Sequence, residues 1–172
     1  MTADGPSDRP DPGIPYYADR LADIDMSPLV AMRQMLIVSH LVMTDLERIA
    51  DRLGYSFADL HLLGRIGIDL GRPVRATDLT TWLFISNAAL SGRIGRLEKD
   101  GLLIRRRSAD DHRSMELSLT PRGEELVDAC IRELVGTAKI AKLFAGMDPA
   151  EMRGFSAVLT KVQGALERDF IP

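Results

Sequence analysis

The sequence has one cysteine and no long hydrophobic run. Among its 172 residues only Cys130 carries a thiol, which excludes an internal disulfide framework and a four-cysteine zinc site. The longest uncharged apolar stretch, residues 35–42, is far shorter than the roughly 20 residues that a membrane span needs. The first 13 residues are acidic and rich in proline, without the apolar segment of a secretory signal. We therefore expect a cytoplasmic protein without a membrane span.

An excess of positive charge is also missing, because the formal net charge is −3. Proteins that bind nucleic acid usually display an excess of Lys and Arg. The charges are unevenly distributed, however: residues 72–122 carry ten basic and six acidic side chains, whereas residues 1–71 carry six and eleven and residues 123–172 carry six and eight. This segregation predicts that the middle of the chain meets an anion and that the two ends have another role.

Proline and periodicity divide the N-terminal part of the chain. Five of the nine prolines lie within the first 28 residues, mixed with Asp and Gly, which predicts a flexible arm over residues 1–27. Over residues 28–55, apolar side chains recur at alternating steps of three and four. This spacing predicts one long helix with a narrow apolar seam, ended by Gly54. A second helix is expected from about Ser56 to Asp69.

Residues 56–120 have the pattern of a winged helix-turn-helix. Residues 77–84 predict a short helix, and Ser86 is the expected N-cap of a second helix over residues 87–100. Two short helices joined by a tight turn make a helix-turn-helix. Residues 102–107 and 115–119 then flank a turn-prone segment and predict a two-stranded β wing.

Residues 121–170 predict further long helices. Thr120 is the expected N-cap and Pro121 the first helical residue. One helix is expected to continue to Ala145, and Pro149 begins the last one. The seams of residues 28–55 and 121–170 are too long for one small winged core, so we expect them to pair across a two-fold homodimer. The predicted fold is mainly α: a winged helix-turn-helix with long N- and C-terminal dimerisation helices.

The helix-turn-helix and wing predict binding to duplex DNA, with helix 87–100 in the major groove. Asn87 and Ser91 are expected to hydrogen-bond bases, and Arg96 to contact a phosphate. Arg113 near the wing tip is expected to enter the minor groove, oriented by Asp111 through a charge-assisted hydrogen bond. The full set of expected DNA contacts comprises Asn87, Ala88, Ser91, Arg96, Lys99, Arg106, Arg107, His112 and Arg113.

Two glycines, Gly92 and Gly95, lie on the helix expected to read DNA. Each costs roughly 1 kcal/mol of helix propensity relative to alanine. Two interpretations remain open at this stage: the glycines let the helix lie deep in the groove, or they relieve crowding inside the protein or are simply tolerated.

The run GLLIRRRSADDHRSMELSLTPRGEEL, residues 101–126, resembles the wing signature of MarR-family transcriptional regulators. The resemblance extends over about residues 28–170. It implies a homodimeric winged-helix regulator whose dimer is formed by helices from both chain ends. The recognition helix is similar to that of the urate-responsive and PecS-like branch, which implies that Asp59, Arg93 and Arg105 sense an anionic ligand.

Several other residues have a structural and a functional interpretation. Trp82 is either a core residue or part of an effector pocket, and Cys130 is expected to be a buried, inert thiol. The three histidines are far apart in the sequence, so no metal site is expected. We find no phosphate loop, nucleophile elbow or other catalytic motif, so neither a cofactor nor enzymatic activity is expected.

These features predict a ligand-responsive repressor that binds a pseudo-palindromic operator as a homodimer, with half-sites about one DNA turn apart. Its expected partners are double-stranded DNA, a second copy of the chain, and an anionic or aromatic small-molecule effector. The alternative is a winged-helix module that binds protein or RNA.

Overall fold

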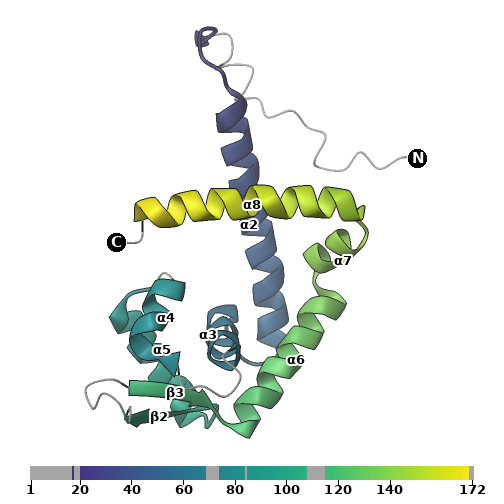
Figure 1. Ribbon diagram of the computed structural model, residues 1–172. Coiled ribbons are helices and arrows are strands. Elements are labelled where there is room, and N and C mark those ends of the chain that lie inside the picture. The colour runs from purple at the N-terminus through teal and green to yellow at the C-terminus, as the bar shows by residue number, and fades with distance from the viewer. Residues whose placement is uncertain (1–16, 18–19, 69–73, 84, 108–114, 171–172) are drawn as a thin grey trace. The chain divides into compact units, whose positions relative to one another are not determined.

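The computed structural model describes residues 17, 20–68, 74–83, 85–107 and 115–170 (Figure 1). The chain divides into two compact units, Met1–Met43 and Thr44–Pro172. Asp111, His112 and Arg113, which the sequence places at the wing tip, lie outside the described residues. The described helices and strands are, in chain order, α2 (Ser27–Arg52), α3 (Phe57–Gly67), β1 (Val74–Arg75), α4 (Ala76–Leu83), α5 (Asn87–Lys99), β2 (Leu103–Arg107), β3 (Met115–Leu119), α6 (Pro121–Thr137), α7 (Lys139–Ala145) and α8 (Pro149–Phe170).

Helix α2 begins in the first unit and displays many apolar side chains to solvent. It has 26 residues, and its most apolar window has a mean hydropathy of 1.3, so by length and composition it is able to cross a membrane. Length and composition do not distinguish such a span from a helix whose apolar side packs against a partner protein. The exposed apolar residues of its first-unit part are Leu29, Met32, Met35, Leu36, Ile37, Val38, Leu41 and Met43.

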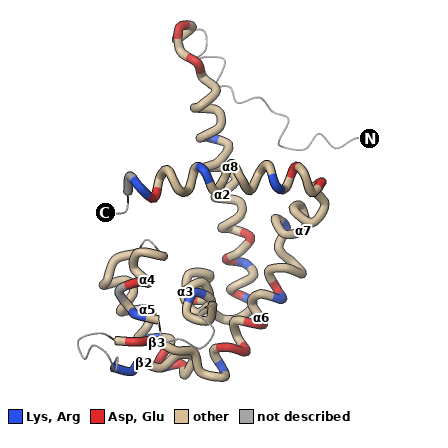
Figure 2. Tube along the Cα trace, in the orientation of Figure 1, with Lys and Arg blue, Asp and Glu red and all other residues tan. Residues whose placement is uncertain are grey.

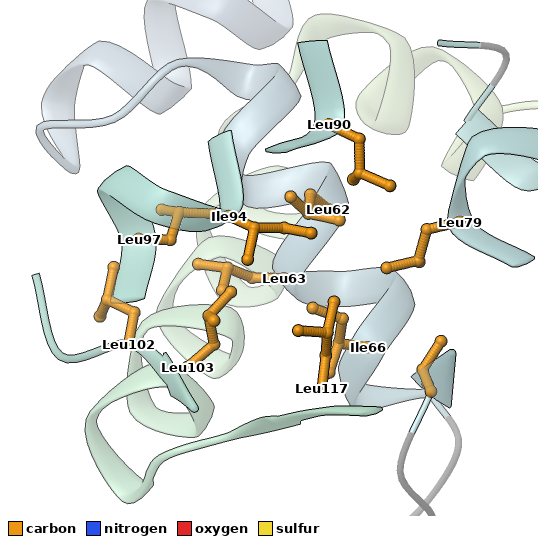
Figure 3. Packing of buried hydrophobic residues seen from close by; sticks show 11 residues of the cluster. Leu62, Leu63, Ile66, Leu79, Leu90, Ile94, Leu97, Leu102, Leu103 and Leu117 are labelled. Atoms are coloured by element: carbon orange, nitrogen blue, oxygen red, sulfur yellow. The ribbon is translucent and has the colours of Figure 1, made fainter. Parts of the chain in front are cut away.

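A compact apolar cluster in the second unit holds the winged helix-turn-helix together. Leu63 and Ile66 of α3 and Leu90, Ile94 and Leu97 of α5 form the inward faces of their helices and are all buried. Leucines from α3, α4, α5 and the sheet point toward one another in this cluster (Figure 3). Its members are Leu62, Leu63, Ile66, Val74, Leu79, Leu90, Ile94, Leu97, Leu102, Leu103 and Leu117.

The sheet has three antiparallel strands in the order β1-β3-β2. The predicted wing strands β2 and β3 are present, with Leu103 opposite Leu119 and Arg107 opposite Met115. The third strand, β1, was not predicted from the sequence, and it pairs Val74 with Leu117. Two residues are too few to show the alternation that identifies a strand, so tertiary pairing and the burial of Val74 define this one.

The predicted N-caps of α5 and α6 are confirmed. Ser86 Oγ accepts a hydrogen bond from the Ala89 backbone N–H, and Thr120 Oγ1 accepts one from Gly123 N–H. The Thr120 hydroxyl also donates to the Gly101 carbonyl at 2.7 Å. Thr120 therefore starts α6 and fastens it to the segment that leads from α5 into the wing.

The long helix expected from Pro121 to Ala145 is interrupted at Ala138, so this expectation was wrong. Ala138 is fully buried and has extended backbone angles, φ −60° and ψ 132°. Asp45 of α2 provides the reason, because its carboxylate accepts a hydrogen bond of 2.6 Å from the Lys139 backbone N–H at the start of α7. A cap supplied from 94 residues away leaves no sign in the local spacing of apolar residues.

Gly123, in the first turn of α6, lies against the backbone of the wing strand. A Cβ atom at this position would overlap the carbonyl oxygen of Leu102, and the backbone there is held by the Thr120 hydrogen bonds. We expect Gly123→Ala to lower the free energy of unfolding by about 1–3 kcal/mol, as other overpacked sites do. Urea denaturation measures this change.

Gly136 on the same helix provides the matched control, because no described atom lies within 4 Å of a Cβ built there. Gly136→Ala is expected to leave the protein as stable or to stabilise it by up to about 1 kcal/mol through helix propensity. Equal effects of the two substitutions would contradict the steric explanation.

Candidate nucleic-acid interface

The outer face of α5 is open and carries small or polar side chains. Leu90, Ile94 and Leu97 anchor the opposite face in the apolar cluster. A helix held in this way by one face presents the other to a groove of duplex DNA. The predicted contact residues of this helix, which are all exposed, are Asn87, Ala88, Ser91, Arg96 and Lys99.

The two glycines of α5 differ in their surroundings. No described atom lies within 4 Å of a Cβ built on Gly92, whereas a Cβ on Gly95 would meet Arg105 Nη2 at 3.5 Å, an ordinary contact. Crowding among the described residues therefore explains neither glycine. Two interpretations of the glycines remain: they allow the helix backbone to approach a ligand closely, or they are simply tolerated at open positions.

Strand β2 ends in three consecutive arginines, blue in Figure 2. Arg105 Nε donates to Glu98 Oε2 of α5 at 2.7 Å. Arg106 and Arg107 are exposed, and no ion pair joins either to a carboxylate among the residues that the structure describes. Two exposed guanidinium groups are thus available on β2, and they point to opposite faces of the strand because they are consecutive.

A buried carboxylate on α3 holds the last turn of α5. Arg96 Nη2 lies 2.6 and 2.9 Å from the two carboxylate oxygens of Asp59. Asp59 is 3% exposed, and Ser56 Oγ donates to its Oδ2 at 2.7 Å. Spacing along the sequence did not reveal this pair because its members are 37 residues apart.

Comparison of the sequence and of the fold with known proteins shows which proteins this chain is similar to. Residues 53–114 match the MarR family model. This segment, which contains the helix-turn-helix, is therefore similar to the DNA-binding part of MarR-family proteins. The family assignment implied by the wing signature is confirmed, and the matched residues include α3, α4, α5, β1 and β2.

Two kinds of relative support the MarR assignment. The HTH-type transcriptional regulator PecS of Dickeya dadantii (strain 3937) is 27% identical over 124 residues, which cover 71% of this chain and 74% of PecS. The MarR family transcriptional regulator Sco3205 of Streptomyces coelicolor, solved in complex with DNA, has a TM-score of 0.74 at 23% identity, covering 83% of this chain and 89% of that chain. AbsC from the same organism has a TM-score of 0.71 at 22% identity, covering 83% and 96%. These structures show the same fold.

Of the three residues that the PecS-like resemblance ties to an anionic effector, Asp59 and Arg105 have separate partners. Asp59 binds Arg96, Arg105 binds Glu98, and Arg93 is half-buried with no hydrogen bond or ion pair to another described residue. Asp59 and Arg105 thus belong to two different ion pairs, and neither pair includes Arg93.

Trp82 is not a core residue. Its side chain on α4 is 40% exposed, and the guanidinium carbon of Arg65 lies 4.6 Å from the ring centroid. Such a cation–π contact is stabilising at a partly exposed site. His61 lies one turn earlier on α3, where burial, with a smaller contribution from the charge of Arg65, lowers its pKa. The His61 ring stacks on Phe57.

Lys99 lies beside an open cavity of about 520 Å³. This cavity is at the C-terminal end of α5, where Arg122 of α6 donates to the Asp100 carbonyl at 3.0 Å. Its lining residues are Leu53, Gly54, Tyr55, Lys99, Asp100 and Arg122. Lys99 therefore faces the start of α6 as well as solvent.

Cys130 is buried on α6, as expected for an inert thiol, and burial raises its pKa. Among the residues that the structure describes, no group of three or more His, Cys, Asp or Glu side chains is able to hold a metal ion. The predicted DNA contacts thus remain the strongest candidate site of the described part of the chain.

Gly92 provides a test of the open face. We expect Gly92→Ala to raise the free energy of unfolding by up to about 1 kcal/mol, because alanine favours a helix and its methyl group meets no described atom. Chemical denaturation measures this gain. A loss of stability would show that Gly92 is packed and would remove it from the candidate interface.

Proposed function

We propose that this chain is a transcriptional regulator that binds duplex DNA and represses its targets. One observation carries the proposal: α5 presents a small, polar face, and strand β2 of the wing has two exposed arginines, Arg106 and Arg107, that have no described carboxylate partner. Phosphate contacts from such arginines supply much of the affinity for DNA. The named relatives are regulators, and Sco3205 was solved with DNA. An RNA- or protein-binding role gains no support from them.

We propose further that the chain acts as a homodimer in the cytoplasm. Apolar side chains are exposed on α2, as given above, and also on α8, where Phe155, Val158, Leu159 and Leu166 are 39–60% exposed. A soluble monomer rarely exposes so much apolar surface. At the other end of α2, Glu47 accepts a hydrogen bond from the Phe57 backbone N–H, so this end of the helix packs into the winged unit and not into lipid.

We also propose that a small anionic or aromatic effector controls DNA binding. The half-buried Arg93, without a described partner, is the available cation, and the exposed Trp82 offers an aromatic surface. An effector changes the affinity for DNA only if it binds one arrangement of the two recognition helices more tightly than another. The match to PecS, at 27% identity, gives weak support to the PecS-like branch and so to a urate-like effector.

The first test is binding to DNA taken from upstream of the chain's own gene, followed by fluorescence anisotropy. We expect the wild-type protein to bind tightly and the dissociation constant to rise steeply with salt, because each phosphate contact releases counterions. Arg106→Gln and Arg107→Gln are each expected to reduce the slope of log K against log[salt] by about 1.

Arg132→Gln is the control for that experiment, because Arg132 is an exposed arginine of α6 that pairs only with Asp128 among the described residues. It should leave affinity and slope unchanged. No binding by the wild type to this DNA or to a selected random duplex would contradict the proposal. Urate and aromatic acids added to the same complex test the effector class.

The second test concerns the dimer. We expect the wild-type protein to elute at twice its chain mass of 19.0 kDa. Leu36→Glu on α2 and Leu159→Glu on α8 should shift the protein toward monomer, because each places a charge on an exposed apolar seam. Gln34→Glu, on the opposite side of α2, is the matched control. Light scattering after size exclusion measures the mass; a wild-type monomer at micromolar concentration would contradict the proposal.

A further inference from the structure

The ion pair between Arg96 and Asp59 fixes the position of α5 on α3. Asp59 lies in the first turn of α3, where Ser56 Oγ both accepts its backbone N–H and donates to its carboxylate. The positive end of the helix dipole also favours a carboxylate there. Residues of α3 and its N-cap therefore fix the position of the Asp59 carboxylate without any contact from α5.

Arg96 provides the opposite charge from the last turn of α5. The side chain of Asp59 is 5% exposed, whereas that of Arg96 is 56% exposed. A buried carboxylate without its cation is strongly unfavourable, so the pair restricts how far the last turn of α5 is able to move from α3. The N-terminal half of α5, with Asn87 and Ser91, is therefore held in position through the last turn of the same helix.

We propose that Arg96 is a positioning residue for the DNA-reading helix and not a phosphate contact. A guanidinium already neutralised by a carboxylate at 2.6 Å offers little net charge to a phosphate. Arg107, exposed on the wing and opposite Met115, has no such partner among the described residues. This inference rests on the proposed DNA binding and changes the role that the sequence suggested for Arg96.

The direction in which Asp59→Asn changes the affinity for DNA distinguishes the two roles of Arg96. Asp59→Asn removes the negative charge and keeps the side-chain shape. If Arg96 positions α5, Asp59→Asn weakens binding to the duplex, on the order of tenfold for a coupled pair of this kind. If Arg96 contacts a phosphate, the same substitution frees its charge, so affinity stays the same or increases.

The experiment compares wild type, Asp59→Asn, Arg96→Gln and the double variant in a salt series on the same duplex, below the melting temperature of every variant. We expect both single variants to weaken binding alike, the double variant to be no weaker than either, and the salt slope to stay at the wild-type value. Arg107→Gln is the control that should lower the slope by about 1. Because Arg96 is exposed, Arg96→Gln keeps the test available if Asp59→Asn does not fold.

Two outcomes would overturn the inference. A lower salt slope in Arg96→Gln would make Arg96 a phosphate contact. Lower melting temperatures with unchanged dissociation constants would make the pair a stability element only. If neither the wild type nor Arg107→Gln binds any duplex, the proposed function is refuted instead. This outcome is seen before the variants of Asp59 and Arg96 are measured.

Discussion

The burial of leucines between α3, α5 and the small sheet is the interaction on which the rest of the winged unit depends. Leu62 and Leu63 on α3, Leu97 on α5, and Leu103 and Leu117 on the sheet are all at most 1% exposed. Close packing of this kind leaves little freedom for one element to shift alone. The apolar cluster fixes which face of α5 is inside, and therefore which small and polar residues are left for a ligand.

A second set of contacts transmits the position of α5 to the long helices. Thr120 and Arg122 of the α6 start bind the carbonyls of Gly101 and Asp100, and Gly123 lies against Leu102. Each of these contacts joins the start of α6 to a backbone group of residues 100–102. The start of α6 and the end of α5 are therefore linked directly as well as through the wing.

Sequence analysis succeeded where the determining interactions are local. Capping by Ser86 and Thr120 acts over three residues, and the stripe Leu90, Ile94, Leu97 follows from helix geometry. It failed where residues distant in the chain decide the structure. The cap from Asp45 that ends α6 at Ala138, the pairing of β1, and the partner of Arg96 all depend on such contacts, which no periodicity encodes.

The net charge is a poor guide to the partner of this chain, because some of its basic side chains are paired with carboxylates and others are not. Asp59 neutralises Arg96 and Glu98 neutralises Arg105, so two of the basic residues that make the middle segment positive are internally compensated. Arg106 and Arg107, at the wing, have no ion pair to a described carboxylate. Because fields of exposed charges fade within about 10 Å in physiological salt, a phosphate at the wing senses these two groups and not the net charge of −3. Under the proposed function, the wing would supply electrostatic attraction to the DNA, and α5 would read the shape and base edges of the groove.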